Sequence, residues 1–284
     1  MKRLLVTGAA GLLGAAIVEE LGRDHEVTAA DHAALDITDV AAIRRMVTEV
    51  RPAVIVNCAA YNDVDGAEDD APAALRVNAF GVRALAAAAR DCQAAFVHYS
   101  TDFVFDGESA RPYTEEDPVN PRNTYAASKL VGEWFAADAP RHYVLRVESL
   151  FGPPPTPVAR RGSVGTIVDR IRNGEVVPVF VDRTVSPAYT PDVAAATRAV
   201  LDREVPPGVY HCVNDGAATW RDVAEEVARQ LGAGLTIKAL TLETFKARAP
   251  RPRYCAMSPA RLASLGVVMP PWRDAIARYL RAGA

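Results

Sequence analysis

The sequence predicts an α/β protein with a doubly wound parallel sheet and a smaller α/β lobe toward the C-terminus. Two features carry this prediction: short apolar runs rich in β-branched residues alternate with longer helix-like runs, and the pattern changes at a cluster of prolines after Phe151-Gly152. Strands that read as continuous apolar runs are buried on both faces, which is typical of a parallel sheet covered by helices. The right-handed crossover of such units then gives a doubly wound sheet.

Each element is predicted from its local pattern, and Asp39 is expected to cap the second helix. Pro153-Pro154-Pro155 with Pro157 predict a rigid, non-helical connector. We therefore expect two parts, residues 1–152 and 153–284, with some later segments returning to the first part. The expected strands of the sheet cover residues 4–6, 26–30, 53–57, 95–99 and 143–147. The expected helices cover residues 12–21, 39–50, 71–89, 164–172, 192–201, 220–231 and 272–280.

Composition excludes several classes of protein. The 284 residues include 32 Lys and Arg against 35 Asp and Glu, so no basic excess is present for a nucleic-acid partner. Five scattered histidines and four cysteines without a C-x-x-C pair predict no metal site, no disulfide framework and a reducing, cytoplasmic location. The uncharged stretch 4–18 after Lys2-Arg3 resembles a signal peptide, yet it is too short to span a membrane. The three glycines within this stretch are better explained by a tight turn between a strand and a helix.

Gly8, Gly11 and Gly14 stand three residues apart between the first strand and the first helix. Glycines there permit a tight turn, a close approach of a pyrophosphate to the backbone and close helix–strand packing, with the phosphates at the helix N-terminus near Leu12-Leu13. Asp31 closes the second strand, where its carboxylate would accept hydrogen bonds from ribose hydroxyls and repel a 2′-phosphate. Separately, each signal has a plain alternative, a small-residue turn or a turn aspartate. Together they predict an NAD(P) site.

The G-x-x-G-x-x-G spacing resembles that of extended short-chain dehydrogenases, and this resemblance assigns further cofactor contacts. It implies that Asp36 and Ile37 flank the adenine, although Asp36 could instead cap the following helix. Three residues after the third strand would let the cofactor cross the sheet edge, with core packing as the alternative for the two alanines. They are Ala59, Ala60 and Tyr61.

Tyr125 and Lys129 stand at i and i+4, on one face of a helix. Reduction of a ketone needs a proton donor, and a nearby ammonium would lower the pKa of the phenol so that it can donate and recover a proton. Thr101 ends the fourth strand, at the sheet edge where such folds bind ligands, and its hydroxyl could orient a carbonyl beside Tyr125. Alone, each is an ordinary surface or turn residue. In this order they predict a catalytic group.

The run from Ser100 to Gly107, S-T-D-F-V-F-D-G, resembles the S-T-D-Y-V-F-D-G signature of the dTDP-4-dehydrorhamnose reductase family. The resemblance covers nearly the whole chain. It implies reduction of the 4-keto group of a nucleotide-linked deoxysugar by NADH or NADPH, with Thr101, Tyr125 and Lys129 as catalytic residues and the C-terminal lobe over the substrate. Further matching segments are Val77-Asn78-Ala79, Leu145-Arg146, Ser186-Pro187, Tyr189-Thr190-Pro191-Asp192, Gly208-Val209-Tyr210-His211 and Arg251-Pro252.

The departures from the family pattern fall on the substrate side. Ser149 stands where the family commonly has a tryptophan that lines the sugar pocket, and the stretch from Arg183 to Ala188 replaces Q-x-G-x-P-T. The reaction type is therefore better specified than the sugar, and Asp31 favours NADH over NADPH. Two alternatives stay open: an epimerase or other ketoreductase of the same superfamily, and a non-catalytic regulatory subunit resembling the methionine adenosyltransferase beta subunit. A homodimer is also expected to be possible.

Overall fold

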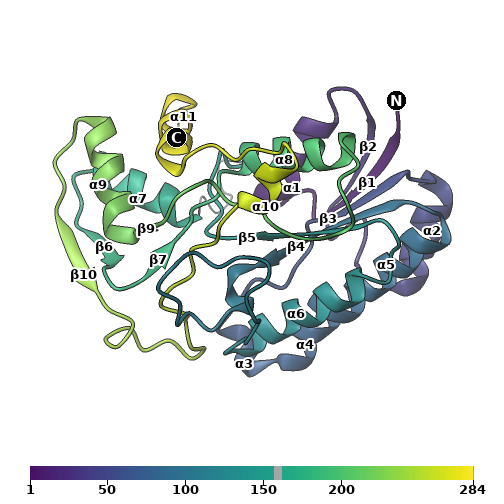
Figure 1. Cartoon of the computed structure of the whole chain (residues 1–284), viewed down its shortest axis with the longest axis horizontal. Helices are drawn as coiled ribbons and strands as arrows, with labels where there is room; N and C mark the ends of the chain where they lie inside the picture. The colour runs from purple at the N-terminus through teal and green to yellow at the C-terminus, as the bar shows by residue number, and fades with distance from the viewer. Residues whose placement is uncertain (157–161, 284) are drawn as a thin grey trace.

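The computed structural model describes residues 1–156 and 162–283, and its centre is a six-stranded parallel sheet (Figure 1). The strand order is β2-β1-β3-β4-β5-β8. From β1 the chain passes to β2 on one side, and β3 and the later strands then follow on the other side of β1. This confirms the doubly wound parallel sheet. The strands are β1 (Arg3–Thr7), β2 (Glu26–Ala30), β3 (Val54–Asn57), β4 (Ala95–Thr101), β5 (His142–Val147) and β8 (Gly208–His211).

Helices cover both faces of the sheet, as Figure 1 shows. The alternation of side chains along β1 sends Leu4 and Val6 into one core and Leu5 into the other, because successive residues of a strand point to opposite faces. The first core includes side chains of α1 (Leu12–Leu21) and α8 (Thr190–Asp202). The second includes side chains of α2 (Val40–Val50), α5 (Val82–Asp91) and α6 (Thr124–Ala136).

Most predicted elements are present within a residue or two, and Asp39 caps α2 through a bond from the Ala42 amide. The single helix expected over residues 71–89 is wrong. The chain there forms α4 (Ala71–Leu75), a π-helical segment η1 (Arg76–Gly81) and then α5, preceded by α3 (Gly66–Asp69). The wider turn brings Asn78 against α6, where a Cβ on Gly132 would lie 2.2 Å from the Asn78 carbonyl oxygen.

The residues after 152 contribute to both parts of the molecule. β8 completes the central sheet, α8 packs on α1 and Leu262 joins the first core, whereas most of the other elements enclose a separate core around Trp220 and Trp272. Residues 153–156 are not helical, and Pro157 lies outside the described residues. The further elements are η2 (Asp102–Val104), α7 (Gly162–Arg172), β6 (Val177–Phe180), β7 (Thr184–Val185), β9 (Ala218–Thr219), α9 (Trp220–Leu231), β10 (Ile237–Leu240), α10 (Ala260–Ser264) and α11 (Trp272–Arg281).

A buried ion pair fixes α6 to β5. The Arg146 guanidinium donates to both carboxylate oxygens of Glu133 at 2.9 and 2.7 Å, and both side chains are about 5% exposed or less. The pair holds the helix that carries Tyr125 and Lys129 at a set position against the sheet. No helix within residues 1–156 and 162–283 has the length and apolar character to cross a bilayer.

Candidate active site

The glycine turn after β1 lies directly against the backbone that follows β3. Gly8 has a φ of 66°, and a Cβ on it would stand 2.5 Å from the Ala59 amide nitrogen. A Cβ on Gly14 would stand 2.2 Å from the Gly8 carbonyl oxygen. Side chains are thus excluded at both positions. No side chain caps α1, so its first amides face the turn with the positive end of the helix dipole.

Two adjoining cavities lie at this carboxyl edge of the sheet, with volumes of about 500 and 260 Å³. Both are lined by Gly11, Ala59 and Ala60, so they form a continuous site across the switch point of the sheet. The structure brings every predicted site residue to one or the other. The larger is also lined by Gly8, Asp31, Asp36, Ile37 and Tyr61, and the smaller by Leu12, Leu13, Thr101, Tyr125 and Lys129.

The acidic residues around the larger cavity also organise the backbone. One Asp31 carboxylate oxygen accepts the Ala34 amide at 2.9 Å, and Asp36 accepts both the amide and the hydroxyl of Thr38. These bonds lower the pKa of Asp36. Ile37 is buried and contributes to the core as well as to the cavity wall. The turn alternative therefore holds for Asp31, alongside its place on the cavity wall. The capping alternative for Asp36 is wrong, because Asp36 bonds to Thr38 within its own loop and Asp39 caps α2.

Thr101, Tyr125 and Lys129 converge on the smaller cavity from β4 and α6. The Thr101 hydroxyl donates to Asp102 at 3.0 Å and accepts the Phe103 amide at 3.2 Å. The Lys129 Nζ donates to the Tyr99 carbonyl at 2.6 Å. Hydrogen bonds thus hold the buried Thr101 and Lys129 side chains in place, and the Tyr125 ring packs edge-on against Phe103 with 6.0 Å between ring centroids.

The electrostatics of this group differ from the sequence-based expectation in one respect. Burial, followed by the Asp102 carboxylate, raises the pKa of Tyr125, so Lys129 does not bring the pKa of the phenol down here. Burial also lowers the pKa of Lys129 to about 8. The phenol is therefore neutral near pH 7 and carries the proton that an acid catalyst must donate.

Two asparagines that the sequence reasoning did not single out connect the elements of the site. Asn57 accepts the Thr7 hydroxyl at 2.7 Å and lies 3.1 Å from a ring nitrogen of His98, while Asn78 accepts the Tyr61 amide and donates to Ser128 on α6. His98 is a buried structural histidine, as expected. For Asn78 the signal was its place in the Val77-Asn78-Ala79 match. For Asn57, the pattern of the third strand contained no signal that would have identified it.

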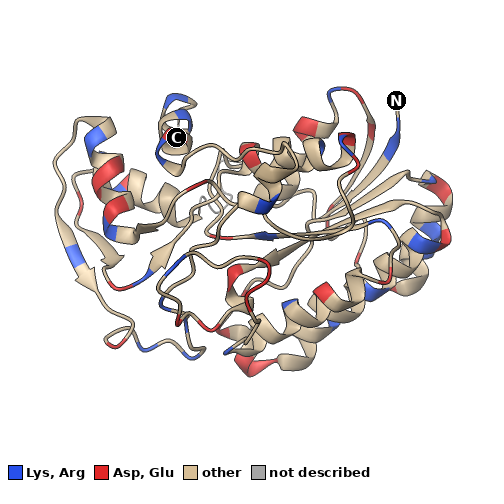
Figure 2. Ribbon diagram, in the orientation of Figure 1, with Lys and Arg blue, Asp and Glu red and all other residues tan. Residues whose placement is uncertain are grey.

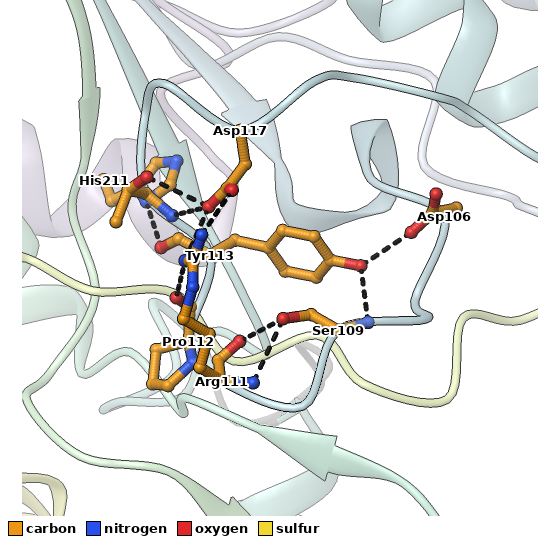
Figure 3. A network of polar contacts seen from close by, with 8 residues as sticks. Asp106, Ser109, Arg111, Pro112, Tyr113, Asp117 and His211 are labelled. Carbon is orange, nitrogen blue, oxygen red and sulfur yellow. Dashed lines mark hydrogen bonds and ion pairs between the residues drawn. The ribbon is translucent and has the colours of Figure 1, made fainter.

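A third hollow of about 730 Å³ lies between the sheet and the C-terminal lobe. One wall is the loop after η2, which the Tyr113 hydroxyl holds by donating to Asp106 at 2.7 Å and accepting the Ser109 amide (Figure 3). The same hydroxyl also accepts the amides of Gly107 and Glu108. Another wall includes Arg251 and Arg253, from the loop after β10, which carries several of the blue positions at the lower edge of Figure 2. The hollow thus combines a rigid loop with guanidinium groups.

The two departures from the family pattern meet near these cavities. Ser149 lines the smaller cavity with a left-handed φ of 44°, which is uncommon for a residue with a side chain. Arg183 donates to the Pro252 carbonyl beside the hollow and lies 3.8 Å from the Asp102 carboxylate beside the smaller cavity. The side chain of Arg183 thus connects the two spaces.

The fold and this site define a Rossmann-type protein of the short-chain dehydrogenase/reductase class. A family model described as the RmlD substrate binding domain matches residues 1–284, so the chain belongs to that family. A "Probable dTDP-4,6-dihydroxy-2-methyloxan-3-one 4-ketoreductase" of Streptomyces antibioticus is 38% identical over 279 residues, 96% of this chain and 93% of the relative. A dTDP-4-dehydrorhamnose reductase of Streptomyces griseus is 37% identical over 286 residues, covering 96% and 91%.

The same relationship is found among solved structures. A dTDP-4-dehydrorhamnose reductase from Bacillus anthracis, in complex with NADP, superposes with a TM-score of 0.92 at 30% sequence identity and covers 99% of both chains. This agreement extends over the central sheet and the C-terminal lobe. A nicotinamide cofactor is therefore supported for this chain.

The buried lysine leads to a prediction about stability. Because the pKa of Lys129 is 10.5 in an ordinary setting and about 8 in the fold, the folded protein binds fewer protons than the unfolded chain between these values. The free energy of unfolding should thus rise with pH across this window. Lys129→Met should abolish that rise and increase stability at neutral pH by about 2–3 kcal/mol.

Urea unfolding at neutral pH and at the top of this window measures the effect. Lys238→Met on β10, where the lysine is exposed, is the matched control and should leave the pH dependence as in the wild type. An equal rise with pH in the Lys129→Met variant would contradict the prediction.

Proposed function

We propose that this protein reduces the 4-keto group of a nucleotide-linked deoxysugar with NADH or NADPH, and that dTDP-4-dehydrorhamnose is its substrate and dTDP-rhamnose its product. The observation that carries the proposal is the meeting of Thr101, Tyr125 and Lys129 with the glycine turn around one cavity. The reductases among its relatives, named above, support the same reaction. The intact catalytic group favours an enzyme over a regulatory subunit.

In this proposal the chain's own residues divide the chemistry. When bound, the nicotinamide supplies the hydride for the carbonyl carbon. The Tyr125 phenol donates its proton to the carbonyl oxygen as negative charge develops there, which its raised pKa allows at neutral pH. Thr101 orients the carbonyl, and Lys129 holds the nicotinamide ribose from the same helical face. The glycine turn and the first amides of α1 hold the pyrophosphate.

The third hollow, of about 730 Å³, is proposed to hold the nucleotide diphosphate of the substrate. The guanidinium groups of Arg122 and Arg253 line it and match the charge and the geometry of phosphate oxygens, whereas the Arg251 guanidinium donates to Asp65. The sugar would then extend past Arg183 toward Tyr125. The lobe formed mainly by residues after 152 would thus be the substrate lobe, and the active site would lie between the two parts of the chain.

The role of Tyr125 can be tested directly. Tyr125→Phe should lower the turnover of dTDP-4-dehydrorhamnose about 10²- to 10⁴-fold, because the variant loses the proton donor. The affinity for the cofactor should stay within a few-fold of the wild type. Absorbance of the reduced cofactor measures turnover, and fluorescence titration measures binding. Tyr143→Phe is the control, since Tyr143 lies on β5 and lines none of the three cavities. Near-normal turnover of Tyr125→Phe would remove the assigned role.

Cofactor preference is proposed to depend on Asp31, whose exposed carboxylate favours NADH and repels the 2′-phosphate of NADPH. Asp31→Asn keeps an acceptor for the Ala34 amide and removes the charge. We expect the affinity for NADPH relative to NADH to rise about tenfold, which corresponds to about 1.4 kcal/mol of removed repulsion. Asp36→Asn should change both affinities alike. An unchanged ratio in Asp31→Asn would refute the proposal.

A homodimer is also proposed. Phe80 on η1 and Trp134 on α6 are 53% and 62% exposed, and the Phe80 ring lies 6.2 Å from that of Phe135, so large apolar side chains gather on neighbouring elements. Burial of these rings against a second copy would remove apolar surface from water. Sedimentation of the purified protein measures the mass, and Trp134→Glu should shift it toward the monomer. A wild-type protein that sediments as a monomer at micromolar concentration would refute the dimer.

A further inference from the structure

A group of four buried polar side chains lies beside the proposed reacting site. Asp102 begins η2, Glu148 follows β5, Arg183 precedes β7, and Cys255 belongs to the segment that bonds to β7. Asp102 and Glu148 are 4% and 2% exposed, and both line the smaller cavity with Thr101 and Tyr125.

Each of the two carboxylates has one bonded oxygen and one oxygen without a partner. The Thr101 hydroxyl donates to Asp102 Oδ1, and the Ser186 amide donates to Glu148 Oε2 at 2.6 Å. Asp102 Oδ2 and Glu148 Oε1 are buried and have no hydrogen-bond partner among the described residues. A carboxylate oxygen of each residue and the Cys255 sulfur lie within 4.8 Å of one another. Two carboxylates this close, each with a buried oxygen that lacks a partner, require either a proton or a cation.

The charges around Asp102 and Glu148 decide whether a proton or a cation completes the pair. Arg183 is the cation that faces both carboxylates, with a nitrogen 3.8 Å from Asp102 Oδ2 and 3.3 Å from the Cys255 sulfur. One guanidinium balances one carboxylate and leaves the second uncompensated. A metal ion among these ligands would meet the guanidinium at close range, and burial raises the pKa of the Cys255 thiol and disfavours the thiolate that binds metals. The group is thus one proton short of neutrality.

The titration of the pair follows from the same contacts. Burial raises the pKa of Glu148 well above its usual range, and the Asp102 carboxylate raises it further, while the Ser186 amide and Arg183 oppose this. Burial also raises the pKa of Asp102 against the effect of Arg183 and the Thr101 hydroxyl. The remaining groups that face the pair are neutral at pH 7, because the pKa values of Tyr125, Tyr254 and Cys255 are raised. Two like charges in one dry site do not both ionise.

We propose that Asp102 and Glu148 together keep one proton at neutral pH and that this acid pair donates a hydrogen bond to an oxygen of the sugar beside the reacting carbonyl, which makes Glu148 a specificity-determining residue. The inference rests on the proposed function, because it takes the sugar nucleotide as the ligand. The unpaired oxygens supply the donor and an acceptor, and the cavity that both side chains line is where the sugar would meet Tyr125. Doubly ionised, the pair has no donor left and can only accept a hydrogen bond, so the bond that it donates to the sugar oxygen is lost.

The test compares two ligands that share the nucleotide and differ in the sugar. Dissociation constants of dTDP-rhamnose and of dTDP are measured by calorimetry on the NADP-loaded protein, and their ratio isolates the contribution of the sugar. In the wild type the sugar should improve binding at neutral pH, and the improvement should fall about 3- to 10-fold as the pH is raised and the shared proton is lost, the range for one hydrogen bond. The titration of Lys129 is common to the wild type and the variants, so it cancels when their ratios are compared at the same pH.

Two substitutions at Glu148 separate the proton from the shape of the side chain. Glu148→Gln keeps the size and a permanent donor, so its ratio should be close to the neutral wild-type value and independent of pH. Glu148→Ser, which removes the acid, should lose about 3- to 10-fold of the sugar contribution at every pH. Glu175→Ser at an exposed site is the control and should follow the wild type.

An infrared measurement detects the proton without a ligand. The wild-type protein should show the carbonyl band of a protonated carboxyl group at neutral pH that Glu148→Gln lacks, and Asp102→Asn provides a second variant should the first be poorly folded. Absence of this band, or a wild-type ratio that does not change with pH, would overturn the inference while leaving the proposed function intact. Failure of both dTDP and dTDP-rhamnose to bind would overturn the proposed function and this inference with it.

Discussion

The close approach of the turn after β1 to the backbone after β3 is the constraint on which the rest of the site depends. A side chain at Gly8 or Gly14 would overlap the backbone atoms of this turn or of Ala59, so the two neighbouring strand ends can meet only through glycine. Their meeting creates the continuous cavity at the switch point of the sheet. It also leaves the amides of α1 free to face an anion.

Burial controls the chemistry of the groups around that cavity. The same loss of water that keeps the Tyr125 phenol protonated lowers the pKa of Lys129, and it prevents Asp102 and Glu148 from both carrying a charge. A charged lysine held in a dry site costs stability. The ion pair between Arg146 and Glu133 joins β5 to α6, and it keeps the helix that carries Lys129 in place despite that cost.

The parts of the site that could be predicted were those specified by local spacing. The glycine turn, Asp31 at the end of a strand and the Tyr125–Lys129 spacing each follow from a pattern within a few residues. The break in the expected helix over residues 71–89 could not be predicted, because an alanine-rich run favours a continuous helix. At the break, Asn78 packs closely against Gly132, a contact between elements far apart in the sequence.

The sequence by itself determined the fold class, the glycine turn and the Tyr125–Lys129 spacing, because the physics of each acts within one strand–turn–helix unit or one helical turn. Only the tertiary structure decided how the departures from the family pattern are used. Glu148, Arg183 and Cys255 come from three distant segments, and their charges become coupled only when the packing of the lobe on the sheet removes water from between them.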